Sequence, residues 1–392
     1  MAQSPANRTV NTIVADVLAQ MPAEQQAEYD KLIQDLSTTG EAGVLGLVEK
    51  INAPGKGSNA NVDYALSGLT HYVMAKGEES VRLVVANAYL KALEKVEERE
   101  TKAFIIRQIQ LLGEDECVDT LVDYLNDESL SGPAARALSA IGTENAQKAL
   151  VASLKRRSGT PKTQKDIIRA IADVPTVEAE PVLKAMLGTE DENLRKELLY
   201  ALSRVGTKAS LEDLADAAEQ AGYTMEKTGA NEAYIALIKR VLEQGDASEA
   251  EKAAKSLLKK ATKAGATQTR EAALQILLAA NPENAMKTAL AALKDTNKDY
   301  RNAALNYASA FANQEFYIEV MKHMMKAKPE VKVDILNWMG RESKISSKHD
   351  LIKNLEIRFD LPARQVFLDQ LKDESFDVRQ AAVWALAKIG DK

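Results

Sequence analysis

A column of basic and polar residues recurs along this chain at a fixed spacing. Arg270, Arg301 and Lys332 follow one another at steps of 31 residues, and Gln164 and Arg195 are separated by the same step. A constant period of this size is typical of a solenoid, in which each unit buries its apolar face only against its neighbours. The spacing therefore constrains the fold more than any other feature of the sequence, and it predicts an array of stacked units.

Each unit contains one segment of helical periodicity, a short acidic turn, a second helical segment and a glycine. The pattern is clearest in residues 373–390 (DESFDVRQAAVWALAKIG), and residues 190–206 (EDENLRKELLYALSRVG) carry a second copy. We call the two helices A and B. Glycine is expected to end helix B in a left-handed cap, with Asn281 in the same role after Arg270. The expected glycines are Gly113, Gly142, Gly206, Gly340 and Gly390, and the aspartates expected to cap helix B are Asp127, Asp295, Asp373 and Asp377.

The chain ahead of the clear repeats is also helical in pattern. Residues 1–100 are expected to form an irregular helical cap that is continuous with the array, and residues 52–59 a loop. Residues 101–392 form the repeat array, with an irregular unit near 207–269. The interval from Arg195 to Arg270 is 270 − 195 = 75 residues, which exceeds two steps of 31 by 13. An insertion or long helices must account for the excess.

The repeat D-x-x-x-D-V-R-x-x-A-x-x-A-L-x-x-I-G at 373–390 resembles the short HEAT-like repeat of the phycobilisome-lyase type. The resemblance covers roughly residues 100–392 through weaker copies. It implies an all-α fold, a right-handed α-solenoid of HEAT-like helix pairs, with B helices lining the concave side. In its overall sequence character, without a diagnostic motif, the chain also resembles the repeat region of larger secreted bacterial proteins. In those proteins such an array precedes a sugar-acting domain. Such repeats serve many unrelated scaffolds, so the resemblance implies no activity.

Composition and motifs argue against most catalytic classes. Cys117 is the only cysteine, and the three histidines (His71, His323 and His349) lack the spacing of a zinc site. No nucleophile elbow or phosphate-binding loop is present. We therefore expect no cofactor, no metal, no catalytic residues and no transmembrane segment. The start Met-Ala-Gln-Ser-Pro looks like a signal-cleavage end, which would make the protein secreted or periplasmic; otherwise it is a cytoplasmic start.

Helical geometry singles out one surface column on helix B. If Val378 is set at zero and each residue advances by about 100°, Ala382, Ala385, Leu386 and Ile389 fall on the buried face, whereas the sixth residue lies at about 240°, away from it. This position holds no aliphatic residue in any repeat. Arginine, tyrosine and tryptophan, which often anchor a partner at a binding interface, are common at this position, so it is a candidate binding surface. The alternative interpretation is an ordinary solvent-exposed stripe. Its members are Arg107, Arg136, Arg169, Tyr200, Gln275, Asn306, Asn337 and Trp384.

The 31-residue column itself has a structural interpretation. Arg195, Arg301 and Arg379 each follow an aspartate by two to four residues. The spacing predicts an ion pair within each repeat that braces neighbouring units.

The leading functional hypothesis is a non-enzymatic scaffold that binds a partner protein or an extended acidic peptide on the concave helix-B face. A second hypothesis is a weak nucleic-acid-binding solenoid, favoured by the arginines of the column and by residues 251–353, which carry 18 Lys/Arg against 11 Asp/Glu. Residues 1–150, with 13 against 22, argue against it. A third is the repeat region of a larger enzyme whose catalytic domain lies beyond residue 392.

Overall fold

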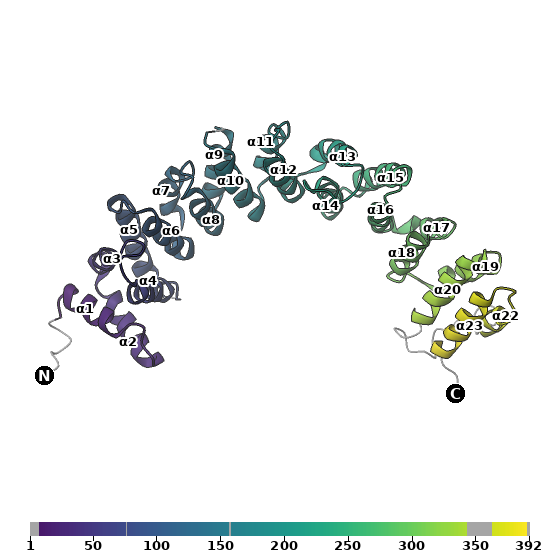
Figure 1. The fold of residues 1–392 in the computed structure, drawn as a ribbon, viewed down its shortest axis with the longest axis horizontal. Coiled ribbons are helices and arrows are strands. Elements are labelled where there is room, and N and C mark those ends of the chain that lie inside the picture. The colour runs from purple at the N-terminus through teal and green to yellow at the C-terminus, as the bar shows by residue number, and fades with distance from the viewer. Residues whose placement is uncertain (1–7, 76, 157, 343–362, 390–392) are drawn as a thin grey trace. The chain divides into compact units, whose positions relative to one another are not determined.

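The computed structural model describes residues 8–75, 77–156, 158–342 and 363–389. Within these ranges all regular secondary structure is helical and no strand occurs, so the all-α prediction is confirmed. The chain divides into two compact units, unit 1 (Met1–Gly206) and unit 2 (Thr207–Lys392). Each unit is an α-solenoid in which antiparallel helix pairs stack side by side (Figure 1).

Unit 1 begins with α1 to α4 and continues into A/B pairs; residues 52–59, between α3 and α4, are not helical, in agreement with the predicted loop. The A helices are α5, α7, α9 and α11, and the B helices α6, α8, α10 and α12 form a second layer in which each contacts the next. The helices are α1 (Val10–Gln20), α2 (Gln26–Ser37), α3 (Gly40–Val48), α4 (Ala60–Val73), α5 (Glu79–Lys95), α6 (Arg99–Leu112), α7 (Val118–Asp123), α8 (Ser131–Ile141), α9 (Glu144–Lys155), α10 (Pro161–Asp173), α11 (Glu180–Lys184) and α12 (Glu192–Val205).

Unit 2 has the same two layers, with A helices α13, α15, α17, α19 and α22 and B helices α14, α16, α18, α20 and α23. The interval of 75 residues holds long helices, since α15 alone has 18 residues. The helices are α13 (Leu211–Gln220), α14 (Ala230–Glu243), α15 (Ala247–Ala264), α16 (Thr267–Ala280), α17 (Pro282–Ala292), α18 (Lys298–Ala308), α19 (Gln314–Met325), α20 (Pro329–Glu342), α22 (Ala363–Gln370) and α23 (Phe376–Ile389).

Helix α12 shows how the repeat sequence produces a B helix. The Asp191 carboxylate accepts hydrogen bonds from the amides of Asn193 (2.9 Å) and Leu194 (3.0 Å), which satisfies two donors of the first turn. Residues spaced by three or four then fall on one face and are fully buried, among them Leu198, Leu202 and Val205. In α23, Ala382 is likewise buried and Leu386 is partly buried, while the side chain of Ile389 lies outside the described residues.

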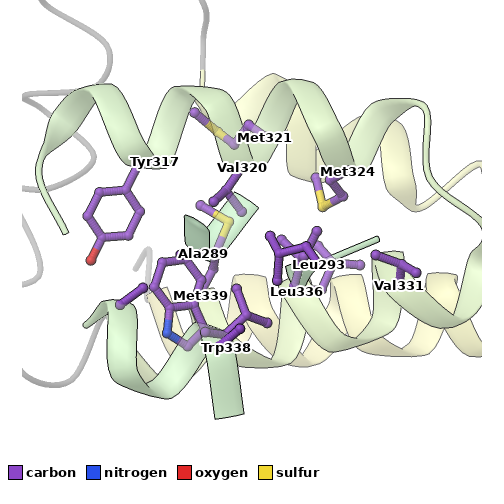
Figure 2. Close-up of a cluster of buried hydrophobic side chains, with 14 of the residues drawn as sticks. Ala289, Leu293, Tyr317, Val320, Met321, Met324, Val331, Leu336, Trp338 and Met339 are labelled. Atoms are coloured by element: carbon purple, nitrogen blue, oxygen red, sulfur yellow. The ribbon is translucent and has the colours of Figure 1, made fainter. Parts of the chain in front are cut away.

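Aromatic and sulfur-containing side chains fill the seam between α19 and α20 (Figure 2). The indole of Trp338 is fully buried and stacks on the Tyr317 ring, with 5.3 Å between ring centroids. Phe316 and the indole form a T-shaped pair with 6.1 Å between ring centroids. The indole Nε1 donates a hydrogen bond to Ser309 Oγ (3.0 Å). These contacts fix the rotation of α20 about its axis, and hence which of its residues face solvent.

The prediction of left-handed glycine caps is correct at Gly142, where φ is 64°, and wrong at three other positions. Gly113 and Gly206 have extended backbones with φ of −72° and −62°. Gly340 lies within α20 rather than after it. Asn281 has φ of −135° and instead caps α17 through its side chain. Close packing explains two of the glycines: a Cβ would lie 2.8 Å from Ile109 O at Gly113 and 2.5 Å from Trp384 Cζ3 at Gly340. Gly390 lies outside the described residues.

Three members of the basic column, Arg270, Arg301 and Lys332, brace neighbouring repeats, but their ion pairs cross to the next repeat rather than closing within one. Arg379 instead donates to the main-chain carbonyls of Asp373 and Glu374. Arg270 pairs with Asp295, and Lys332 Nζ lies 2.6 Å from Asp373 Oδ2. Arg301 Nη2 lies 2.6 Å from Asp334 Oδ2, with both side chains only 3% exposed. Within its own repeat Arg301 donates to the main-chain carbonyl of Asp295 (3.0 Å), while the Asp295 carboxylate accepts from the Asn297 amide (2.8 Å). Asp295 therefore does not cap α18 as predicted, because the side chain of Asn297 takes that role.

Candidate functional site

The first half of the predicted surface column lies in unit 1, on four consecutive B helices. Arg107 is on α6, Arg136 on α8, Arg169 on α10 and Tyr200 on α12, and all four side chains are exposed. Tyr200 keeps 50% of its surface exposed, which is high for a large aromatic residue. Because each of these B helices packs on the next, equivalent positions recur at successive layers of the stack.

One arginine of this column is held by a neighbouring repeat. Arg169 Nη2 lies 2.6 Å from Glu197 Oε1, which belongs to the next B helix, α12. The hydrogen bond to Glu197 raises the pKa of Arg169 above its usual value. The guanidinium nevertheless remains 58% exposed, so it can reach a second anion without losing its present partner.

Arg107 lies at the end of the column beside a small pocket of about 170 Å³. Its guanidinium carbon is 6.0 Å from the centroid of the Phe104 ring. Asp63 of α4 also lines the pocket. Burial raises the pKa of Asp63, and the positive charge of Arg107 offsets only part of that rise. The nearby carboxylate thus offsets part of the positive charge at this end.

The second half of the column lies in unit 2 and is uncharged. Gln275 on α16 and Asn306 on α18 are exposed, Asn337 on α20 is half-buried, and Trp384 on α23 is 37% exposed. Gln275 Oε1 accepts a hydrogen bond from Lys239 Nζ of α14 (3.2 Å). The two halves of the column therefore offer different chemistry, cationic in unit 1 and amide with an aromatic residue in unit 2.

Asn337 and Trp384 line the same groove, which has a volume of about 520 Å³. The groove runs over three B helices, α18, α20 and α23. Gly340 allows α23 to come close enough for the Trp384 ring to pack on the α20 backbone, since a Cβ at this position would overlap the ring. The indole is therefore fixed at the wall of the groove rather than free to rotate in solvent.

Sequence reasoning did not connect any carboxylate with the column, and it assigned Asp377 only to a helix cap. Glu197 precedes Tyr200 by three residues, and Glu330 and Asp377 precede Asn337 and Trp384 by seven. Residues at these intervals share one face of a helix, so the helical angle could have identified them. Glu197 and Tyr200 lie on the helix adjacent to Arg169, whereas Glu330 and Asp377 line the groove of unit 2.

The described residues provide no cluster of three or more His, Cys, Asp or Glu side chains that could hold a metal ion. Cys117 is fully buried, and burial raises the pKa of its thiol to about 12. His349 lies outside the described residues. No helix of the described segments is long and apolar enough to span a membrane.

Stacked A/B pairs with an exposed helix-B column define a solenoid of HEAT-like helical repeats. In agreement, the family model described as HEAT repeats matches residues 152–235. No curated protein sequence matches the chain.

Three solved structures of similar fold are Kap121p, Kap121p bound to Nup53p and the Kap95:Nup1 complex. Kap121p is 10% identical with a TM-score of 0.52 and 97% of this chain covered. For the Nup53p complex the values are 11%, 0.57 and 99%, and for Kap95:Nup1 12%, 0.55 and 97%. The chain covers 49%, 45% and 56% of these three chains, respectively, or about half of their length. At such low identity the likeness extends to the fold alone.

Proposed function

We propose that this protein is a non-enzymatic scaffold that binds an extended segment of a partner protein on its helix-B face. In unit 1 the arginine column (Arg107, Arg136 and Arg169, with Tyr200 beside them) receives an acidic segment. The observation that carries the proposal is that the three arginines are exposed at equivalent positions of consecutive, mutually packed B helices.

Guanidinium groups repeated at the spacing of stacked helices, roughly 10 Å, suit an extended chain with acidic side chains at regular intervals. Tyr200 adds an exposed aromatic surface at the α12 end of the column. Two of the structures with a similar fold are complexes with another protein, Nup53p or Nup1, which supports a protein-binding role for a solenoid of this kind.

The proposal is tested by fluorescence anisotropy with a labelled acidic peptide of about twelve residues, repeating Gly-Glu-Ser. We expect the triple variant Arg107→Ala, Arg136→Ala, Arg169→Ala to lose at least tenfold in affinity with little change in Tm, because exposed side chains contribute little to stability. A matched control removes the same charge from A helix α9 and its end, at Lys148, Lys155 and Arg156, all of which are exposed. Equal losses in the two variants would refute the proposal.

The same column could hold the phosphates of a nucleic acid, and the experiment separates the two ligands. An oligonucleotide of similar length should bind more weakly than the peptide at about 150 mM salt, because phosphate contacts weaken steeply with ionic strength. Tighter binding of the oligonucleotide would favour the nucleic-acid hypothesis. The phycobilisome-lyase type of the repeat, a secreted parent protein and a catalytic domain beyond residue 392 stay predictions from the sequence.

A further inference from the structure

The groove of unit 2 has its own electrostatic character. Its lining consists of Lys298, Glu330, Val333, Asp334, Asn337, Asp377, Gln380, Ala381 and Trp384. Three of these residues are carboxylates and one is an ammonium. Asp334 is buried and neutralised by Arg301, and its other oxygen accepts from Asn302 Nδ2 (3.2 Å), so it does not act on a ligand.

The two remaining carboxylates, Glu330 and Asp377, are free to interact with a cationic ligand. Glu330 and Asp377 are exposed, and neither forms an ion pair with any residue in the described part of the chain. They occupy equivalent positions in consecutive B helices, seven residues before Asn337 and Trp384. The same position holds exposed Asp299 on α18, so three successive B helices of unit 2 carry an acidic row beside the column. In unit 1 the same position holds Glu100, Ser129, Lys162 and Asn193, which is no acidic row.

The wall of the groove is suited to a cation as well. The Trp384 ring is held by its contact with Gly340 and keeps 37% of its surface exposed. The Lys388 ammonium lies 5.8 Å from the ring centroid, so the ring already attracts one cation of its own helix. Val333 and Ala381 supply a short apolar surface on which the aliphatic part of a long side chain can rest.

We propose that this groove binds a cationic segment of a partner protein, with a lysine or arginine side chain lying against Trp384 and its charge near Glu330 and Asp377. The inference rests on the proposed function and adds that the two units prefer segments of opposite charge, acidic at the arginine column and basic at the groove. The volume of about 520 Å³ accommodates one long side chain with adjoining backbone.

The test uses the whole chain and a labelled peptide of about twelve residues that repeats Gly-Lys-Ser, at about 20 mM and about 200 mM salt. We expect binding at low salt with a change in tryptophan fluorescence, and this change should be absent in Trp384→Phe. The double variant Glu330→Gln, Asp377→Asn should bind about tenfold more weakly.

The matched control is Glu315→Gln, Asp369→Asn, which makes the same change in net charge on A helices α19 and α22. Both residues are exposed, and Glu315 opens α19 as Glu330 opens α20, so the helix-dipole contribution of Glu330 is reproduced. Asp369 lies near the end of α22 and matches Asp377 in charge and exposure only. The control should bind the lysine peptide as the parent does. Circular dichroism of each variant checks that the helices are retained.

Equal affinity of the groove variant and its control would overturn the inference, as would failure of the lysine peptide to bind at all. Neither result would affect the proposed function if the arginine-column variant still loses the glutamate peptide. If the glutamate peptide is unaffected by that variant and the lysine peptide is weakened only by the groove variant, the inference stands and the acidic ligand of unit 1 is wrong.

Discussion

At the scale of single residues, Arg301 and Arg270 occupy equivalent positions yet differ in how their guanidinium groups are satisfied. Arg301 Nε and Nη2 both donate to Asp334 Oδ2, at 2.9 and 2.6 Å, and Asn302 donates to the other oxygen of Asp334. Subtracting 31 from these three positions gives Arg270, Glu271 and Ala303. Ala303 therefore stands where Arg301 has the carboxylate of Asp334. As a result, Arg270 Nε is buried without a hydrogen-bond partner.

We predict that the double variant Glu271→Asn, Ala303→Asp stabilises the protein by about 1 kcal/mol, because it supplies the acceptor that Arg270 Nε lacks. Urea unfolding followed by circular dichroism measures the effect. Ala303→Asp alone should gain less, since burial already raises the pKa of Glu271 and a second carboxylate would face it. A double variant less stable than the parent would show that the two sites are not equivalent.

The pair Lys332–Asp373 should make stability depend on pH. The hydrogen bond from Lys332 lowers the pKa of Asp373, and the Ser375 amide adds to this. A carboxylate with a lowered pKa in the folded state stabilises the protein above its unfolded pKa, near 4, and this contribution is lost as pH falls through the folded pKa. Asp373→Asn should therefore lower Tm at pH 7 but not near pH 2. A difference in Tm that persists at pH 2 would contradict this explanation.

At the scale of helices, burial on a B helix follows from its angle alone, and substitutions on one helix can test this. Leu202→Asp on α12 places a charge in a fully buried seam and should cost several kcal/mol. Tyr200→Asp, two residues earlier, introduces the same charge at a position that is 50% exposed. We expect a large fall in Tm for the first variant and a small one for the second, measured by circular dichroism.

The same angle predicted the exposure of every column residue except Asn337, which is half-buried, since the angle depends only on the 3.6-residue turn and on which residues are apolar. It could not predict the groove, because Trp384 and Asn337 are 47 residues apart and their proximity depends on how α23 packs on α20. The prediction of left-handed glycine caps was wrong at Gly113 and Gly340 for a related reason. Gly113 and Gly340 are required by close contacts with other atoms, and no local pattern distinguishes that role from a helix cap.

At the scale of the whole molecule, most contacts of a solenoid join neighbouring repeats, so stability is approximately a sum of local terms. Each of the two units has its own stacked A/B layers and its own buried side chains. We therefore predict that residues 1–206 and 207–392, expressed separately, each give a helical circular dichroism spectrum and a cooperative melt. The 207–392 fragment should also retain binding of the lysine peptide, because every residue that lines the groove lies within it. A fragment without helical signal would show that the units depend on one another for folding, and the binding comparison would then have to use the full chain.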